Sequence, residues 1–173
     1  MQYGFTDTAK ESGKARFIRI TDIDETGHVR SGNQKYIDLS DEAKNYLLEQ
    51  GDLLVARTGA TYGKTAIFDE DYPAVFASYL IRLRFDQSKV LPGFYWLFAQ
   101  SDEYWDQAKM LVTGGGQPQF NANVIQKIKV PLIPIEDQQK FIDAIRVEET
   151  VMSANRNIVD IYQAKIDKLI NEL

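Results

Sequence analysis

The chain has 173 residues, 44% of them hydrophobic, which suffices for one domain with a real core, or for one domain and an extension. It contains no cysteine, and this excludes disulfides, thiolate metal sites and a catalytic cysteine. The net charge of −5 argues against a protein that coats nucleic acid regardless of sequence, because phosphate neutralisation dominates such affinity.

The N-terminus shows neither a basic segment nor an apolar stretch of the kind that forms a signal peptide. No apolar run reaches the roughly 20 residues that a membrane span requires. We therefore expect a cytoplasmic protein. Its charge is uneven, with a net of −2 over residues 1–134 and −3 over residues 135–173. The nearly neutral front part leaves room for a local basic face.

The first half of the chain predicts short strands separated by turns. Alternation of apolar and polar residues predicts a strand over residues 17–23, and residues 35–39 resemble a second. A helix is expected over residues 41–49, with Ser40 as its N-cap. Two further strands, 52–57 and 65–68, enclose a loop at residues 58–64.

The second half mixes strands with helices. Residues 74–84 are rich in β-branched and aromatic types and predict a strand. Residues 92–109 begin with proline and carry aromatic residues at helical spacing, which predicts a helix that contributes to the core. Residues 124–133 predict another strand. Without a regular βαβ order, the pattern indicates an α+β domain.

The loop between the strands at 52–57 and 65–68 resembles a phosphate-binding P-loop only superficially. A P-loop requires glycine where this chain has Thr58, and the sequence after Lys64 is strand-like, so nucleotide hydrolysis is disfavoured. The loop still combines donor side chains with two glycines, which suits contact with phosphates or bases. An ordinary hairpin loop is the competing interpretation. The candidate side chains are Arg57, Thr58, Thr61, Tyr62 and Lys64.

A second candidate loop contains three glycines followed by amide side chains. Gln117, Gln119 and Asn121 each offer a donor and an acceptor, the chemistry that pairs with the edge of adenine. Some of these amides could instead cap turns. No catalytic or metal site is expected elsewhere. His28 is the single histidine, and the acidic residues before it fit a solvated turn better than a nuclease site.

The chain after Pro134 predicts one long helix, which divides the protein into residues 1–134 and 135–173. Apolar residues recur at alternating steps of four and three to the end of the chain, as in a coiled coil. The alternative is a helix folded back on its own domain. The predicted seam for dimerisation or spacing contains Phe141, Ile145, Met152, Asn155, Val159, Tyr162, Ile166 and Leu169.

Five segments in order carry a family resemblance: FIRITDI, GDLLVARTGATYGK, ASYLIRL, GGGQPQFN and VPLIPIEDQQ. Together they cover most of the chain, which resembles a target recognition domain and the following helix of the DNA specificity subunit (HsdS) of type I restriction–modification systems. The resemblance implies a non-catalytic subunit that reads one half of a split double-stranded DNA target. It implies no cofactor of its own.

Residue roles follow from this resemblance as expectations. Gln117, Gln119 and Asn121 are expected to read bases, and Arg57 and Lys64 to anchor the DNA. Lys14 and Arg16 are expected to contact phosphates. The implied partners are methyltransferase subunits that carry S-adenosylmethionine, a restriction subunit, and a second copy or half-subunit bound through the long helix.

The chain departs from the family pattern, because members usually carry two recognition domains and two helices. The sequence begins at Met1, where the resemblance leads us to expect a preceding strand and a tryptophan-containing lead. A half-subunit that dimerises, one unit of a larger gene and an excised fragment all fit this difference. The main functional alternative is a coiled-coil assembly module that binds protein and no DNA. An enzyme, either a nuclease or an NTPase, ranks third.

Overall fold

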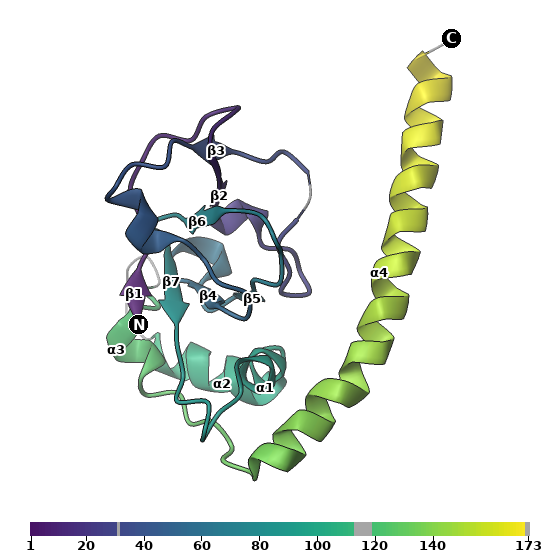
Figure 1. The fold of residues 1–173 in the computed structure, drawn as a ribbon. Coiled ribbons are helices and arrows are strands. Elements are labelled where there is room, and N and C mark those ends of the chain that lie inside the picture. The colour runs from purple at the N-terminus through teal and green to yellow at the C-terminus, as the bar shows by residue number, and fades with distance from the viewer. Residues whose placement is uncertain (31, 113–118, 172–173) are drawn as a thin grey trace.

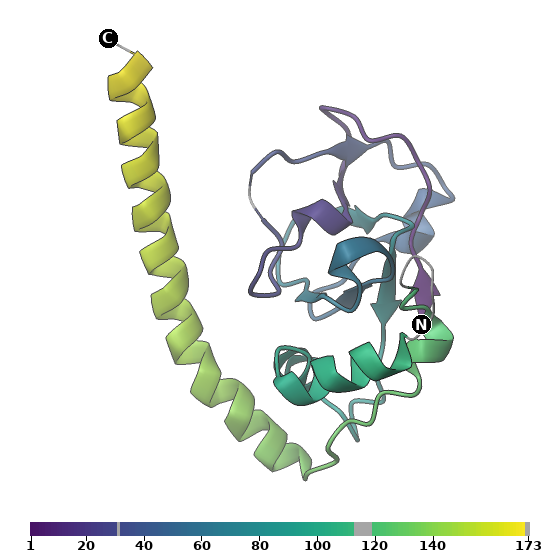
Figure 2. The same cartoon turned by 180° about the vertical axis from the view of Figure 1, so that it is seen from behind.

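The computed structural model describes residues 1–30, 32–112 and 119–171, and it consists of an α+β domain followed by one long helix (Figure 1). The α+β prediction is therefore confirmed. The described part of the domain contains two small sheets and three α-helices, and the last helix of the chain extends beside the domain, as both views show (Figures 1 and 2).

Within the described residues, seven strands form two sheets. The first is antiparallel throughout and has the order β1 (Gln2–Tyr3), β7 (Leu80–Leu83), β4 (Leu53–Ala56) and β5 (Thr65–Ile67). The second has the order β3 (Tyr36–Ile37), β2 (Ala15–Ile18) and β6 (Ala74–Phe76), with β2 and β6 parallel. Short 3-10 helices also lie between strands: η1 (Ile20–Asp22), η2 (Ala43–Tyr46) and η3 (Gly59–Thr61).

The first sheet is covered on both faces, so its two central strands, β4 and β7, are buried along their whole length, including Arg82 of β7. Leu53 and Val55 of β4 face α1 (Pro92–Phe98) and α2 (Asp102–Leu111), whereas Leu54 and Ala56 pack with residues of the second sheet. This division follows from the two-residue period of a strand. The first sheet is thus the middle layer of the domain.

Two helices follow the loop after α2. α3 (Ala122–Ile125) is one short turn, and α4 (Ile135–Asn171) has 37 residues, which at 1.5 Å per residue is about 55 Å. The first turns of α4 contact the domain: the rings of Phe94 and Phe141 lie 6.4 Å apart, and Gly93 faces Ile142. His28 reaches Glu149 farther along the helix, with 3.8 Å between Nε2 and Oε1.

Several sequence predictions in the first half were wrong in detail. The strand expected over 17–23 is β2 and ends at Ile18, because Asp22 bonds to the backbone and guanidinium of Arg19 and bends the chain into η1. The helix expected over 41–49 is only the 3-10 turn η2. Glu42, not Ser40, is the N-cap of this turn and makes no capping bond with its side chain, although the Ser40 hydroxyl accepts a hydrogen bond from the amide of Ala43 at 3.1 Å.

The second half needs three corrections. Residues 74–84 form two strands in different sheets, β6 and β7, separated by a turn that the Leu80 amide closes on the Ala77 carbonyl. The helix expected over 92–109 breaks before Ser101, which caps α2. The strand expected over 124–133 is wrong, because Asn121 caps α3 there and two prolines follow.

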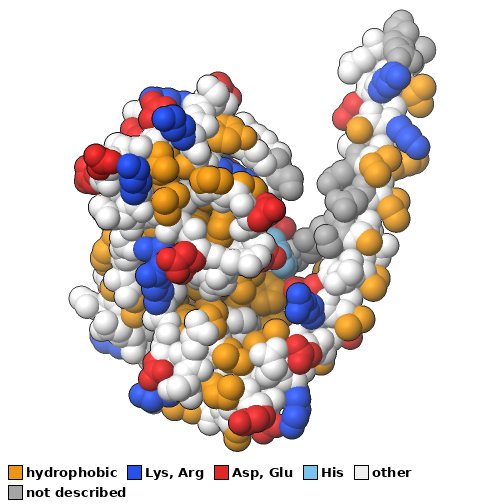
Figure 3. All heavy atoms as spheres, in the orientation of Figure 1, with side chains coloured by type: hydrophobic (Ala, Val, Ile, Leu, Met, Phe, Trp, Pro, Cys, Tyr) orange, Lys and Arg blue, Asp and Glu red, His pale blue; other side chains and the backbone are white. Residues whose placement is uncertain are grey.

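The long helix expected from the seven-residue spacing is confirmed as α4. Its predicted seam is largely uncovered: Phe141, Val159 and Tyr162 are 56%, 64% and 65% exposed. Hydrophobic side chains are visible along the length of the helix (Figure 3). The alternative of a helix folded back on its own domain fits only the first turns, since the described apolar side chains from Val151 onward are mostly exposed.

Candidate functional site

The two loops singled out in the sequence meet in the structure. The amide of Phe120 donates to the carbonyl of Arg57 at 2.7 Å, and Thr58 pairs with Gln119 in an isolated antiparallel bridge. The strand β4 ends at Ala56, so the loop that follows it lies beside the end of the amide-rich segment. We call Arg57, Thr58 and Gln119 the junction.

The loop from β4 to β5 has a defined conformation. Gly59 and Gly63 have φ of 76° and 78°, which a residue with a Cβ adopts only with strain. The amide of Gly63 donates to Ala56 at 2.8 Å, and the hydroxyl of Tyr104 donates to the carbonyl of Gly63 at 2.7 Å. Burial raises the pKa of Tyr104 well above its ordinary value, so this hydroxyl keeps its proton. The loop therefore presents its side chains from a fixed backbone.

Arg57 differs from the other predicted anchor, Lys64. Arg57 is half-buried, and its guanidinium carbon lies 5.1 Å from the ring centre of Tyr3. The Nε of Arg57 is buried without a hydrogen-bond partner. Lys64 instead pairs with Glu25 at 2.9 Å, so its charge is already balanced within the domain. The geometry favours Arg57 over Lys64 as the available cation.

The other predicted residues of this loop have mainly structural contacts. Tyr62 packs its ring against Trp105 and Phe120, at centroid distances of 6.4 and 6.1 Å. Thr58 is buried, whereas Thr61 is half-buried in η3. Tyr62 and Thr58 therefore mainly stabilise the conformation of the loop and do not project from it toward a ligand.

The three amides have different surroundings. Gln119 is exposed beside Thr58, and its side chain bonds to no residue that the structure describes. Asn121 is the N-cap of α3, with its Oδ1 accepting from the amide of Val124 at 3.2 Å, so its side chain is partly committed to the fold. Gln117 lies outside the described residues.

The two predicted phosphate contacts belong to the second sheet and do not join the junction. Lys14 is exposed just before β2. Arg16 is 3% exposed, and it bonds to the hydroxyl of Tyr72 and the carbonyl of Arg30. We therefore correct the expectation for Arg16, because a buried guanidinium bonded within the domain does not suit a phosphate contact.

Two exposed tyrosines beside Arg57 were missed from the sequence. Tyr3 is 44% exposed under the guanidinium, and Tyr79 is 59% exposed, with its carbonyl accepting from the amide of Arg57 at 3.0 Å. Tyr79 stands next to Leu80 in the quoted ASYLIRL segment, but nothing in the sequence shows that Tyr3 reaches residue 57. Among the described residues, the surface around the junction thus combines the cation of Arg57, the amide of Gln119 and the aromatic rings of Tyr3 and Tyr79.

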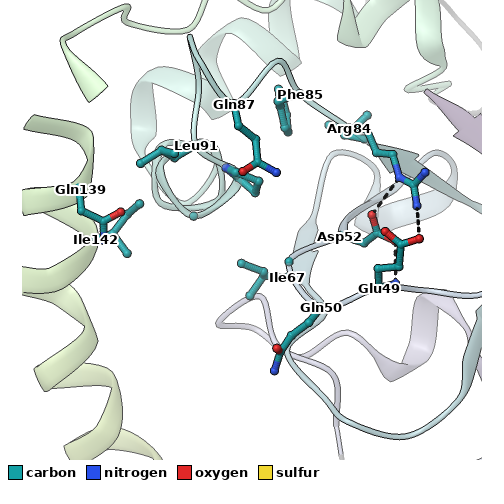
Figure 4. A pocket seen from close by; sticks show the side chains of 14 residues that line it. Glu49, Gln50, Asp52, Ile67, Arg84, Phe85, Gln87, Leu91, Gln139 and Ile142 are labelled. Carbon is teal, nitrogen blue, oxygen red and sulfur yellow. Dashed lines mark hydrogen bonds and ion pairs between the residues drawn. The ribbon is translucent and has the colours of Figure 1, made fainter. Parts of the chain in front are cut away.

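A cavity of about 510 Å³ opens between the far ends of β4 and β7 and the start of α4 (Figure 4). One wall carries the carboxylates of Glu49 and Asp52, both paired with Arg84 at 3.2 and 3.3 Å. Gln139 and Ile142 of α4 lie on the opposite side (Figure 4). These carboxylates are neutralised by arginine, so the cavity lacks the free acid and base that catalysis would use.

Neither metal coordination nor membrane insertion is supported in the described ranges. No cluster of three or more histidine, cysteine or acidic side chains there is arranged to hold a metal ion. His28 packs its ring edge-on against Trp96, 5.2 Å between centroids. In the part of the chain that the structure covers, no helix combines the length and apolar character needed to cross a membrane.

Comparison with known proteins identifies relatives of this arrangement. Residues 3–150 match the profile of a family described as the type I restriction modification DNA specificity domain. No curated protein sequence matches the chain.

Two solved structures share the fold. The HsdS subunit from Thermoanaerobacter tengcongensis aligns with a TM-score of 0.59 at 20% identity, over 82% of this chain and 37% of that one. A chain from a study of complex assembly and conformational transition of the type I R-M system aligns with a TM-score of 0.64 at 19% identity, over 89% and 42%. The present chain therefore spans about two fifths of the length of the solved chains it matches.

Proposed function

This chain belongs to the family of type I restriction–modification DNA specificity domains, and on that premise we propose that it reads one half of a bipartite double-stranded DNA target. It does so without catalysing a reaction. Methyltransferase subunits, which carry S-adenosylmethionine, and a restriction subunit act at the site that it selects. α4 connects this half to a second one.

One observation carries the assignment of the DNA-reading face. The junction brings Arg57 beside Gln119, although the two residues lie far apart in the sequence. Arginine pairs with guanine through two hydrogen bonds and glutamine pairs similarly with adenine, so the junction offers complementary readers in one place. Exposed aromatic rings beside it add contact area.

The spacer role is supported by the exposed seam of α4. A helix about 55 Å long with Val159 and Tyr162 more than 60% exposed has an apolar stripe that its own domain does not cover. A second helix packed along this stripe buries it, as in a coiled coil. If the partner is a second copy, two-fold symmetry places two identical half-sites in inverted orientation.

The same stripe favours the second candidate function, an assembly module that binds protein alone. The two functions differ in their response to salt. A DNA reader loses affinity for duplex DNA as the salt concentration rises, because the release of counterions from the phosphates then favours binding less. An assembly module shows no such salt-dependent DNA binding.

The experiment is a selection from duplexes with a randomised centre, using the full chain together with its methyltransferase subunit. We expect one short motif to be enriched by the wild type. Gln119→Ala, alone and with Gln117→Ala, is expected to relax at least one position of that motif. Gln87→Ala is the matched control, because Gln87 is also exposed but follows the opposite end of β7. An unchanged motif in the double variant refutes the base-reading assignment, and the absence of any motif refutes the function.

A further inference from the structure

The arginines of the domain are almost all engaged by the domain itself. Six arginines precede residue 135, and five of them bond to carboxylates, a hydroxyl or backbone carbonyls. Those five are Arg16, Arg19, Arg30, Arg82 and Arg84. Arg57 makes no hydrogen bond or ion pair through its side chain with any described residue, and its buried Nε has no partner. An unpaired buried donor costs free energy. Contacts other than side-chain hydrogen bonds must therefore hold the Arg57 side chain in this position.

The support for Arg57 is Tyr3. The ring of Tyr3 lies 5.1 Å from the guanidinium carbon, within the range of a cation–π contact. Tyr3 is itself fixed at two points: its backbone pairs with Ile81 of β7, and its hydroxyl accepts from the amide of Ala122 at 3.3 Å. The tyrosine therefore links β1 to the start of α3 and supports the guanidinium between them.

The backbone of Arg57 is equally well fixed. Its amide donates to Tyr79 and its carbonyl accepts from Phe120, at 3.0 and 2.7 Å. Both ends of the side chain are thus constrained, at the backbone and at the guanidinium. A free arginine side chain has many rotamers. Ordering it before binding therefore reduces the conformational entropy that is lost when its planar guanidinium binds a ligand.

The surroundings of Arg57 favour a base over a phosphate. A phosphate clamp gathers several free cations, but the nearest predicted cation in the loop, Lys64, is paired with Glu25. The exposed neighbours are Tyr3, Tyr79 and Gln119, which carry no charge. A single ordered fork among uncharged side chains matches the paired acceptors of guanine in the major groove.

We propose that Tyr3 is a positioning residue that orients Arg57 to read a guanine in the half-site. The inference rests on the proposed function and goes beyond it, because it names the residue that supports the reader and the base that is read. Arg57 is thereby a specificity-determining residue and not only an anchor.

The experiment measures the affinity of the full chain with its methyltransferase subunit for the selected duplex and for versions with each guanine replaced. We expect Arg57→Ala to weaken binding to the selected duplex by about 10- to 100-fold and to abolish discrimination at one guanine position. Tyr3→Leu should relax the same position to a smaller extent. Tyr3→Phe keeps the ring and loses only the hydroxyl bond to Ala122, so its effect should be smaller than that of Tyr3→Leu. Tyr79→Phe should remain close to the wild type.

The double variant decides whether Tyr3 acts through Arg57. Tyr3→Leu should have no further effect on discrimination when Arg57 is already alanine. An equal effect in both backgrounds overturns the positioning role. Uniform weakening of all duplexes by Arg57→Ala, with a smaller salt dependence, shows a phosphate contact and overturns the guanine assignment. If the wild type selects a motif that does not depend on Arg57, only this inference fails; if it selects none, the proposed function fails.

Discussion

Gln138 accepts a hydrogen bond through its side-chain oxygen from the backbone amide of Leu91 at 2.9 Å, and this contact joins the first turn of α4 to the segment before α1. The same side chain donates to the carbonyls of Lys89 and Ile133, at 2.8 and 2.9 Å. Gln138 is fully buried, with 0% of its surface exposed. Its amide therefore fixes the direction in which the long helix leaves the domain.

Replacing Gln138 with leucine is expected to destabilise the protein by about 2–4 kcal/mol. The change leaves an amide and two carbonyls without their partner in a buried site, and each unsatisfied group costs about 1–3 kcal/mol. Denaturant unfolding measures the difference. Gln139→Leu, at an exposed position of the same helical turn, is the control and should change stability by less than about 0.5 kcal/mol. Equal effects of the two variants would show that the buried amide has no special role.

The contacts of Gln138 also show the limits of sequence reasoning. The start of α4 was predictable from the prolines before it and the seven-residue spacing after it, because both are local patterns. The contact with Leu91 was not, since it depends on how segments distant in sequence pack together. The order of strands in two sheets has the same origin.

The candidate site, too, was predictable from the sequence only in part. The loop at 58–64 and the amide-rich segment were both recognised from composition, but their meeting at the junction was not. Tyr3 was overlooked because its strand, β1, has only two residues and leaves no periodic pattern. Arg16 was expected to contact phosphates, whereas the hydroxyl of Tyr72 and the carbonyl of Arg30 bond to its guanidinium inside the domain, and these long-range contacts leave no local pattern in the sequence.

Arg82→Met is expected to cost about 3–5 kcal/mol of unfolding free energy. Arg82 and Asp52 form a buried ion pair of 3.0 Å with side chains 5% and 6% exposed, and removing one partner leaves a buried charge. Thermal and denaturant unfolding both measure this loss. Arg84→Met is the matched control, since Arg84 reaches the same carboxylate from a side chain that is 53% exposed, and its loss should cost less than about 1 kcal/mol. Comparable losses in the two variants would contradict the importance of burial.

The ionised carboxylate of Asp24 is expected to stabilise the fold at pH values above its ordinary pKa of 3.8. This stabilisation should be lost as the pH falls below that value. Burial opposes ionisation of its carboxylate, but hydrogen bonds from His28 and Thr26 outweigh burial and hold the pKa of Asp24 below 3.8. The ionised form is therefore the one that the fold favours. Asp24→Ala should reduce stability by about 1 kcal/mol at neutral pH.

The pH dependence of that difference provides the measurement. Unfolding free energies of the wild type and Asp24→Ala are compared from neutral pH to below 3.8, where their difference should shrink. Other carboxylates titrate in both proteins, so the comparison isolates Asp24. A difference that stays constant or grows with acid would contradict the sign of the shift.

Substituting lysine for Val159 in the seam is expected to weaken self-association or pairing with a second half-subunit by at least about 10-fold. A charge placed in the apolar stripe of a coiled coil must be buried on pairing or must separate the helices. Sedimentation equilibrium measures the association. Ala164→Lys is the control, since Ala164 is also exposed but lies on the other side of α4. If both variants associate as the wild type does, the seam is not the pairing surface.

The proposed function depends on sequence-specific DNA reading, which competition binding measures. A labelled duplex carrying the selected motif is bound to the full chain with its methyltransferase subunit, and unlabelled duplexes with the motif or with the same bases shuffled compete for it. The account predicts that the matching duplex competes at least about 1,000-fold better than the shuffled one at physiological salt. Equal competition by both duplexes would contradict it.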